Sequence, residues 1–374
     1  MEQLPVSCIF SGDVFSSLKY GGLYDSICLL SEQFTKMHVQ NEYYGLQALT
    51  KVEILSSSKL FPIVSSSTTL KNLSIQYSPY LLEPLAVSRH RRRGLRPIVH
   101  RTFHSVPPSN RKAPSIVQVA DLIPDRWLPK TVENQNWLRK KNSAILKADH
   151  VIVHTNYVKN ELVEILGIGE SDISVISLAP STRKIARNQN RNNYGRYILF
   201  VGNRNDHKNF NNLIQAFLCL SREDKSLSLI AYGGSLPSRE EVAEISNLNL
   251  SNRITFISDS DSDVQTLYAN ALVFVYPSYD EGFGIPPLEA MTERCVVASS
   301  SAGPMREVLG DAAIYFDPQD VNDMSQAIQK AIEDNVLRSS LLNEGTIQTS
   351  KYSYEKAAVA HLEVYSSVAN SWYE

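Results

Sequence analysis

The second half of the chain alternates short apolar runs with longer segments of helical periodicity. The apolar runs include YILFVG (197–202), LSLIAYGG (227–234) and LVFVYPS (272–278), and helix-length segments such as 209–220 lie between them. Strands that are apolar throughout are typical of parallel sheets with helices on both faces. This half therefore predicts a doubly wound α/β domain, in which ligands bind at the carboxyl ends of the strands.

The first half shows the same pattern less regularly, as in VSCIFSG (6–12). Between the halves, the segment 180–195 is polar and poor in large apolar residues, which indicates a linker. We therefore expect a first domain over 1–180 and a second over 196–353. The last segment, 354–374, carries apolar residues on one helical face, and we expect this helix to complete the first domain.

The composition is that of an ordinary globular protein. The 374 residues are 43% hydrophobic and 20% charged with a formal net charge of −2, which gives no global electrostatic reason to bind nucleic acid. The four cysteines form no C-x-x-C pair, which favours reduced thiols over a disulfide or zinc framework. No apolar run is long enough to span a bilayer and no leader segment is apparent, so we expect a cytoplasmic protein.

The segment SRHRRRGLR (88–96) is the local exception in charge. One interpretation is a solvated surface loop. The alternative is a patch for anionic lipid headgroups or for a phosphorylated acceptor. In that case Arg89, Arg91, Arg92 and Arg93 would make peripheral contact with the inner face of the membrane.

The stretch EGFGIPPLE (281–289) combines two carboxylates with glycines and a proline pair. The prolines 286–287 suit the first turn of a helix, so the amides of 282–284 would lie at its N-terminus, where anions such as phosphates bind. Glu289 would fall in the first helical turn and Glu281 in the loop before it, an arrangement that suits a ligand with hydroxyls on both sides of a charged centre. The alternative is a tight turn with a glutamate placed by the helix dipole alone.

A second candidate site follows the apolar run that ends at Gly202. The turn GNRNDHKNF (202–210) carries Arg204 and Lys208, and two cations at the carboxyl end of a strand would neutralise a diphosphate. The alternative is a solvated polar turn, with His207 at a helix start. The acidic stretch DSDSD (259–263) is interpreted as a helix cap, so no metal site is expected.

Seven residues separate the two glutamates of YPSYDEGFGIPPLEAM (276–291), and this segment resembles the donor-site signature of the retaining glycosyltransferases of family four. That family includes bacterial enzymes of polysaccharide biosynthesis and has the GT-B fold, two doubly wound Rossmann-like domains facing a cleft. The resemblance extends to 200–210 and 305–318 and, more loosely, to GDVFSSLKYGGL (12–23) and VADLIP (119–124).

The resemblance implies roles for individual residues. The implied catalytic residues are Glu281, Arg204, Lys208 and Asp121. The implied donor-binding residues are Gly21, Gly22, Gly202, Tyr232, Ile257, Ser258, Gly282, Phe283, Gly284, Ile285 and Glu289. Glu281 would bind the donor sugar, Glu289 the ribose, and the two cations the diphosphate. Because the cations and a helix N-terminus meet the leaving-group charge, neither a metal nor another cofactor is expected.

The implied function is transfer of a hexose from a nucleoside diphosphate sugar to a sugar or lipid-linked saccharide, with retention at the anomeric carbon. For the donor we favour UDP-glucose, with GDP-mannose as the alternative. Two positions depart from the family: Ala120 stands where many members have histidine, and LYDS (23–26) where Arg-Tyr is common. These departures leave open a nucleotide-sugar-binding protein with little or no catalysis. A GT-B epimerase is disfavoured by the paired glutamates with arginine and lysine.

Overall fold

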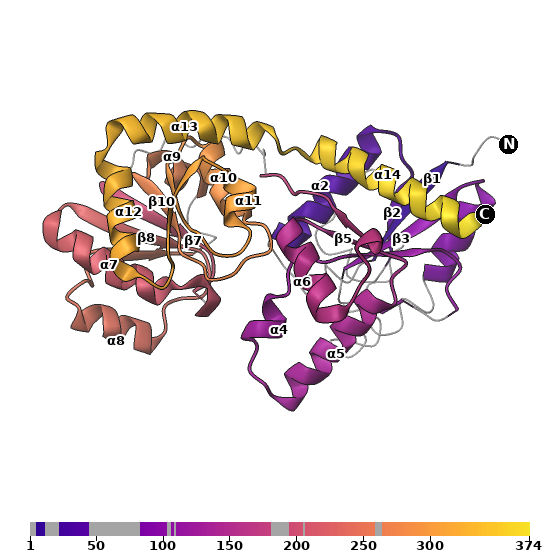
Figure 1. The fold of residues 1–374 in the computed structure, drawn as a ribbon, viewed down its shortest axis with the longest axis horizontal. Helices are drawn as coiled ribbons and strands as arrows, with labels where there is room; N and C mark the ends of the chain where they lie inside the picture. The colour runs from indigo at the N-terminus through magenta and orange to yellow at the C-terminus, as the bar shows by residue number, and fades with distance from the viewer. Residues whose placement is uncertain are drawn as a thin grey trace. The chain divides into compact units, whose positions relative to one another are not determined.

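The computed structural model divides the chain into two compact units, residues Met1–Leu178 with Ser353–Glu374, and residues Ala179–Tyr352 (Figure 1). The structure describes residues 5–11, 22–44, 83–102, 106–107, 110–180, 194–204, 206–258 and 264–374. Of the segment that we expected to act as a linker, 181–193 lies outside the described residues.

The first unit contains a six-stranded parallel sheet in the order β2-β1-β3-β4-β5-β6. Its strands are β1 (Val6–Ser11), β2 (Asn41–Tyr44), β3 (Arg96–Thr102), β4 (Ser115–Gln118), β5 (His150–Val153) and β6 (Ile173–Val175). Its helices are α2 (Gly22–Lys36), α4 (Ile123–Trp127), α5 (Val132–Leu146), α6 (Asn156–Leu166), the short η2 (Glu170–Asp172) and α14 (Tyr354–Tyr373), together with a helical stretch at 83–92. The terminal helix α14 packs against α2, β1 and β3 (Figure 1), where it buries Tyr365 and four other side chains.

The second unit contains a parallel sheet in the order β12-β11-β10-β7-β8-β9. Its strands are β7 (Arg196–Val201), β8 (Leu227–Tyr232), β9 (Ile254–Ile257), β10 (Val273–Tyr276), β11 (Val297–Ser300) and β12 (Ala313–Phe316). Numbered along the chain from β7, this is the order 3-2-1-4-5-6 of Rossmann-type sheets, and it reverses between β7 and β10. In such sheets, ligands bind beyond the carboxyl ends of the strands at this reversal.

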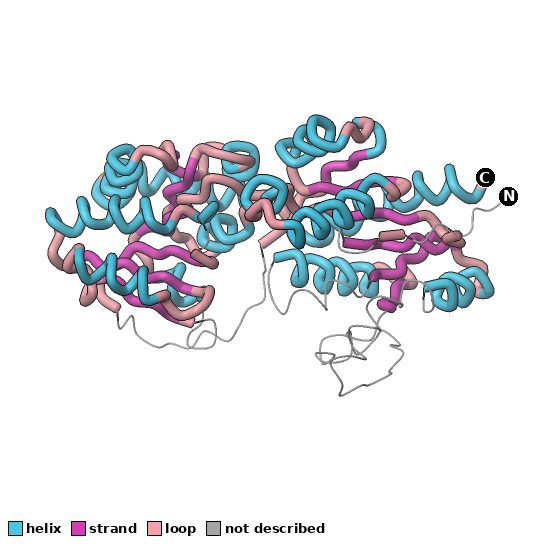
Figure 2. Tube along the Cα trace, turned by 90° about the horizontal axis from the view of Figure 1, so that it is seen from below, coloured by secondary structure: helices cyan, strands magenta, loops and turns pink. Residues whose placement is uncertain are grey.

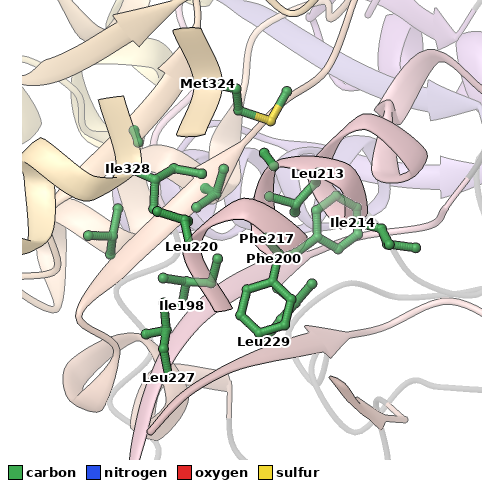
Figure 3. Packing of buried hydrophobic residues seen from close by; sticks show 14 of the residues in the cluster. Ile198, Phe200, Leu213, Ile214, Phe217, Leu220, Leu227, Leu229, Met324 and Ile328 are labelled. Atoms are coloured by element: carbon green, nitrogen blue, oxygen red, sulfur yellow. The ribbon is translucent and has the colours of Figure 1, made fainter. Parts of the chain in front are cut away.

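Helices cover both faces of the second sheet (Figure 2). They are η3 (Asp206–Lys208), α7 (Phe210–Glu223), α8 (Arg239–Asn247), α9 (Val264–Asn270), α10 (Ile285–Thr292), α11 (Met305–Leu309), α12 (Val321–Glu333) and α13 (Asn335–Ser350). On one face, α7 places Leu213, Phe217 and Leu220 at helical spacing in one core cluster with apolar residues of β7 and β8, and α12 packs beside it (Figure 3). The prediction of doubly wound parallel sheets is confirmed in both units.

A buried polar network crosses the sheet of the first unit. His100 Nδ1 lies 2.5 Å from the Tyr365 hydroxyl, and its Nε2 lies 2.9 Å from Gln118 Oε1. Gln118 Nε2 lies 3.0 Å from His154 Nε2, while Nδ1 of that histidine lies 2.8 Å from the Ile176 carbonyl oxygen. These partners suit neutral rings, each with one donor and one acceptor nitrogen.

Burial keeps the histidines of this network uncharged. It lowers the pKa of His100 to about 3, with a further contribution from His361, and lowers the pKa of His154 to about 4. Burial also lowers the pKa of His361 to about 4, and among the described residues its Nε2 has no hydrogen-bond partner. A proton on any of these rings would therefore be a buried, uncompensated charge.

Acidification from pH 7 to pH 5 should destabilise the first unit. Unfolded histidines titrate near 6.5, so the unfolded chain binds protons in this window that the buried rings, with pKa values of about 3 and 4, do not. Each such histidine adds a slope of up to about 1.4 kcal/mol per pH unit. The contribution of the neutral histidines to the free energy of unfolding is complete above pH 6.5 and is lost as the pH falls below it.

Urea midpoints across this range test the effect by tryptophan fluorescence, because all three tryptophans lie in the first unit. His361→Leu should reduce the slope by about a quarter to a third, because burial also lowers the pKa of His150 in this unit. His38→Asn, which alters an exposed histidine of the same unit, serves as the matched control. Midpoints that do not vary between pH 7 and pH 5 would contradict the buried, neutral assignment.

Candidate active site

Two loops meet where the order of the second sheet reverses. One follows β7 and carries Lys208, and the other follows β10 and carries Glu281. Lys208 Nζ lies 2.6 Å from Glu281 Oε1, and the side chains are 18% and 9% exposed. This ion pair joins residues 73 positions apart in the sequence.

The pair lies beside the last residue of β10. Lys208 Nζ lies 5.5 Å from the centre of the Tyr276 ring. Burial, followed by the Glu281 carboxylate, raises the pKa of Tyr276 well above its ordinary value, so its hydroxyl stays protonated as a hydrogen-bond donor. Burial and the charge of Lys208 lower the pKa of His207, so this histidine is uncharged at neutral pH.

Arg204 has a different environment from Lys208. Its Nε donates to Glu241 Oε1 at 2.7 Å, while Nη1 and Nη2 donate to the carbonyl oxygens of Gly233 at 3.2 Å and Ser235 at 2.6 Å. The guanidinium carbon lies 4.9 Å from the centre of the Phe256 ring, and the side chain is 5% exposed. Arg204 thus fixes the loop between β8 and α8.

The alternative of a solvated polar turn does not describe these two cations, because the side chains of Arg204 and Lys208 are only 5% and 18% exposed. The two carbonyls that bind Arg204 come from a loop 29 and 31 positions along the chain, and the carboxylate of Glu241 comes from α8, 37 positions away, so the local sequence does not reveal these partners. Lys208 is the more exposed of the two cations.

The start of α10 explains the glycines in the candidate stretch. Gly284 is the N-cap residue, with φ 94°, and a Cβ atom there would lie 2.8 Å from Met305 Cε. On the other side of the loop, a Cβ on Gly303 would lie 3.4 Å from the Glu281 amide nitrogen. A side chain at Gly284 would therefore require Met305 to shift, and both glycines have left-handed backbones that favour glycine.

The helix begins one residue earlier than the prolines suggested. It starts at Ile285, so Glu289 is its fifth residue and does not lie in the first turn as we expected. The prolines 286–287 occupy the second and third positions and provide no amide donors. The donors at this helix start are therefore those of Ile285 and the preceding loop.

The remaining donor-side residues lie along the carboxyl edge of the same sheet. Tyr232 ends β8 and Ile257 ends β9, followed by Ser258. The carbonyl oxygen of Tyr232 accepts from the Gly202 amide at 2.9 Å, and that of Ile257 accepts from the Gly233 amide at 2.9 Å. In the loop after β10, Gly282 is buried and Phe283 packs edge-on against Tyr352 at 5.6 Å.

In the first unit, Asp121 follows β4. Its Oδ1 accepts a hydrogen bond from the Ile123 amide at 3.0 Å, which fixes the turn before α4. Ala120 is partly buried against the core beneath. Gly22 is the first residue of α2, whereas Gly21 lies outside the described residues.

The acidic stretch 259–263 also lies outside the described residues. Within the described ranges, no three histidine, cysteine, aspartate or glutamate side chains converge as metal ligands. None of the described helices is both long and apolar enough to cross a membrane.

The comparisons with known proteins find similarity to glycosyltransferases. Residues 181–348 match the family model "Glycosyl transferases group 1". The chain is 31% identical over 172 residues to O-antigen chain mannosyltransferase B of Escherichia coli, a match that covers 45% of each protein. It is 27% identical over 238 residues to the O-antigen chain mannosyltransferase RfbU of Salmonella typhimurium, covering 63% of this chain and 65% of that protein. Each match thus spans less than two thirds of the relative's own length.

Solved structures establish the fold. A glycosyltransferase from Rickettsia africae superposes with a TM-score of 0.72 at 16% identity, covering 97% of this chain and 98% of that one. WaaG, a glycosyltransferase involved in lipopolysaccharide biosynthesis, superposes with a TM-score of 0.68 at 15% identity, covering 96% and 99%. The chain has the GT-B fold, as its resemblance to the glycosyltransferases led us to expect.

Gly284→Ala should destabilise the second unit more than the same substitution at a left-handed glycine with open space around it. Gly195→Ala, at φ 70° with no atom within 4 Å of the added Cβ, should cost about 1–2 kcal/mol of unfolding free energy from backbone strain alone. Gly284→Ala adds the contact with Met305 and should cost about 1–3 kcal/mol more. Urea unfolding of both variants measures the difference, and equal costs would mean that Met305 moves aside freely.

Proposed function

We propose that this protein is a glycosyltransferase that moves a hexose, with retention, from a nucleoside diphosphate sugar to a saccharide or lipid-linked acceptor in polysaccharide biosynthesis. The observation that carries the proposal is the Lys208–Glu281 pair at the reversal of a Rossmann-type sheet, beside the glycine-rich start of α10. The family match over 181–348 supports the same activity.

For the donor sugar, we propose mannose. The names of both curated relatives describe mannosyl transfer, which favours the GDP-mannose alternative over the UDP-glucose that we expected from the sequence. UDP remains the competing nucleotide, because a structural relative, HepE of Anabaena, was solved in complex with UDP.

The chemistry of the site is an exchange of partners. A donor diphosphate that binds at Lys208 competes with Glu281 for the same ammonium group. Once displaced, the carboxylate is available to accept hydrogen bonds from the sugar hydroxyls. Lys208 and the amide dipoles at the start of α10 then stabilise the departing diphosphate, so we propose that the reaction needs no metal.

We also propose that the arginine-rich segment touches anionic membrane surfaces. Arg89 pairs with Glu42 at 2.8 Å and Arg91 lies over the Tyr373 ring at 5.0 Å, whereas Arg92 and Arg93 are exposed at the end of their helix. Co-sedimentation with phosphatidylglycerol vesicles should be lost in the Arg92→Glu, Arg93→Glu double variant. Equal sedimentation of both proteins would contradict this contact.

A donor panel tests the proposed activity. GDP-mannose should raise the melting temperature and release GDP more readily than UDP-glucose releases UDP. At least about half of the turnover should survive excess EDTA, since no step is assigned to a metal. A rise in melting temperature without turnover would favour the nucleotide-sugar-binding alternative. Complete loss in EDTA, restored by magnesium or manganese, would contradict metal independence.

Substitutions in the ion pair should separate binding from turnover. Lys208→Ala should lose about 1.5–3 kcal/mol of nucleoside diphosphate affinity, the scale of a charge-assisted hydrogen bond. Glu281→Gln should bind the nucleoside diphosphate at least as tightly as wild type, because Lys208 no longer has a competing carboxylate, while its kcat should fall. Glu289→Gln should mainly raise the donor KM. Calorimetry and steady-state kinetics measure these effects, and wild-type affinity in Lys208→Ala would rule out the assignment.

A further inference from the structure

Asn209, next to Lys208, makes contacts that the binding chemistry does not use. It is 4% exposed and has a left-handed backbone with φ 57° and ψ 34°. Its side-chain Nδ2 donates to the Pro277 carbonyl oxygen at 3.0 Å and to the Pro318 carbonyl oxygen at 2.7 Å. These carbonyls lie just beyond the carboxyl ends of β10 and β12.

These contacts take the place of the helix-capping hydrogen bond that an asparagine usually makes at this position. Asn209 is the N-cap residue of α7, and an N-cap asparagine ordinarily accepts a hydrogen bond from the first turn of its helix. Here its side chain makes no capping bond. The side-chain amide instead donates across the sheet edge to two carbonyls that follow strand ends.

Further bonds join the same loops. The Tyr279 amide donates to the His207 carbonyl oxygen at 2.8 Å. Asn212, in the first turn of α7, donates to the Tyr279 hydroxyl at 2.9 Å and to the Pro318 carbonyl oxygen at 3.0 Å. The loops after β7, β10 and β12 are therefore tied together around the Lys208–Glu281 pair.

We infer that Asn209 is a positioning residue that sets the separation of Lys208 and Glu281. It holds the β7 loop, on which Lys208 is the adjacent residue, against the β10 loop that carries Glu281 four positions after Pro277. Asparagine suits this position because it tolerates the left-handed backbone and brings two donors on a short side chain. Its consequence for turnover rests on the proposed transferase function, but its effect on the ion pair does not.

The test compares Asn209→Gly with Asn249→Gly. Asn249 is also left-handed, at φ 58°, and lies after α8, so the control removes an asparagine side chain from a similar backbone elsewhere in the same unit. The first readout is acetylation of Lys208 by N-hydroxysuccinimide acetate, followed by peptide mass spectrometry with exposed Lys225 as internal reference. Asn209→Gly should speed Lys208 labelling about fivefold or more, because the local structure that holds the pair opens. Asn249→Gly should leave it unchanged.

The second readout is turnover with GDP-mannose and UDP-glucose. Asn209→Gly should lower kcat about tenfold or more. Because the asparagine acts through the lysine, the double variant Lys208→Ala, Asn209→Gly should have the same kcat as Lys208→Ala alone. If Asn209→Gly does not fold, Asn212→Ala is tested in its place. This variant should also speed the labelling of Lys208, by a smaller factor. Unchanged labelling, or losses of turnover that multiply in the double variant, would overturn the inference. Absence of turnover in wild type, with labelling as expected, would instead overturn the proposed function alone.

Discussion

The candidate site depends on one ion pair, Lys208 with Glu281, and on the sheet order that brings its partners together. The connections between consecutive parallel strands run over one face of the sheet or the other. Only where the strand order reverses do the loops after two neighbouring strands lead to opposite faces. In the second unit that point lies between β7 and β10. A lysine after the first strand and a glutamate after the fourth therefore meet across 73 residues of sequence. An ion pair with so little solvent exposure has a desolvation cost, which the attraction between its two charges must offset.

Arg204 and Lys208, the two cations of the same turn, differ in their contacts and in their structural roles. Arg204 makes hydrogen bonds to two carbonyls and a carboxylate, and it stacks on an aromatic ring, which together hold the loop between β8 and α8. Glu241 in turn belongs to the capping box of α8, so the arginine is tied to a helix start. Lys208 has one carboxylate partner, a flexible stem and greater exposure. This is the difference expected between a guanidinium used as a fixed fork and an ammonium used as a point charge.

Much of the fold was predictable from the sequence, because buried parallel strands read as apolar runs between helical segments. The glycines and prolines around 282–287 also predicted a helix start, since few residues tolerate those backbone angles. Tertiary partners were not predictable in this way. The burial of Arg204 depends on carbonyls from another loop, and carbonyls carry no sequence signal. The same holds for Asn209, whose acceptors are proline carbonyls 68 and 109 positions away. In the first unit, the histidine network joins residues from three strands or strand ends and the terminal helix, which no local pattern connects.

Under the proposed function, the pairing of Lys208 with Glu281 also affects which ligands the site prefers. A nucleoside diphosphate alone would engage the lysine but leave the glutamate, 9% exposed, without its cation. A free sugar would offer hydroxyls to the glutamate but would leave the lysine without an anion. A nucleotide sugar brings both groups on one molecule, with an anionic diphosphate for the lysine and hydroxyl donors for the glutamate, so under the proposed function the pair discriminates in favour of the intact donor. Because the diphosphate and the sugar hydroxyls must reach their partners at a fixed separation, the geometry held by Asn209 is part of that discrimination.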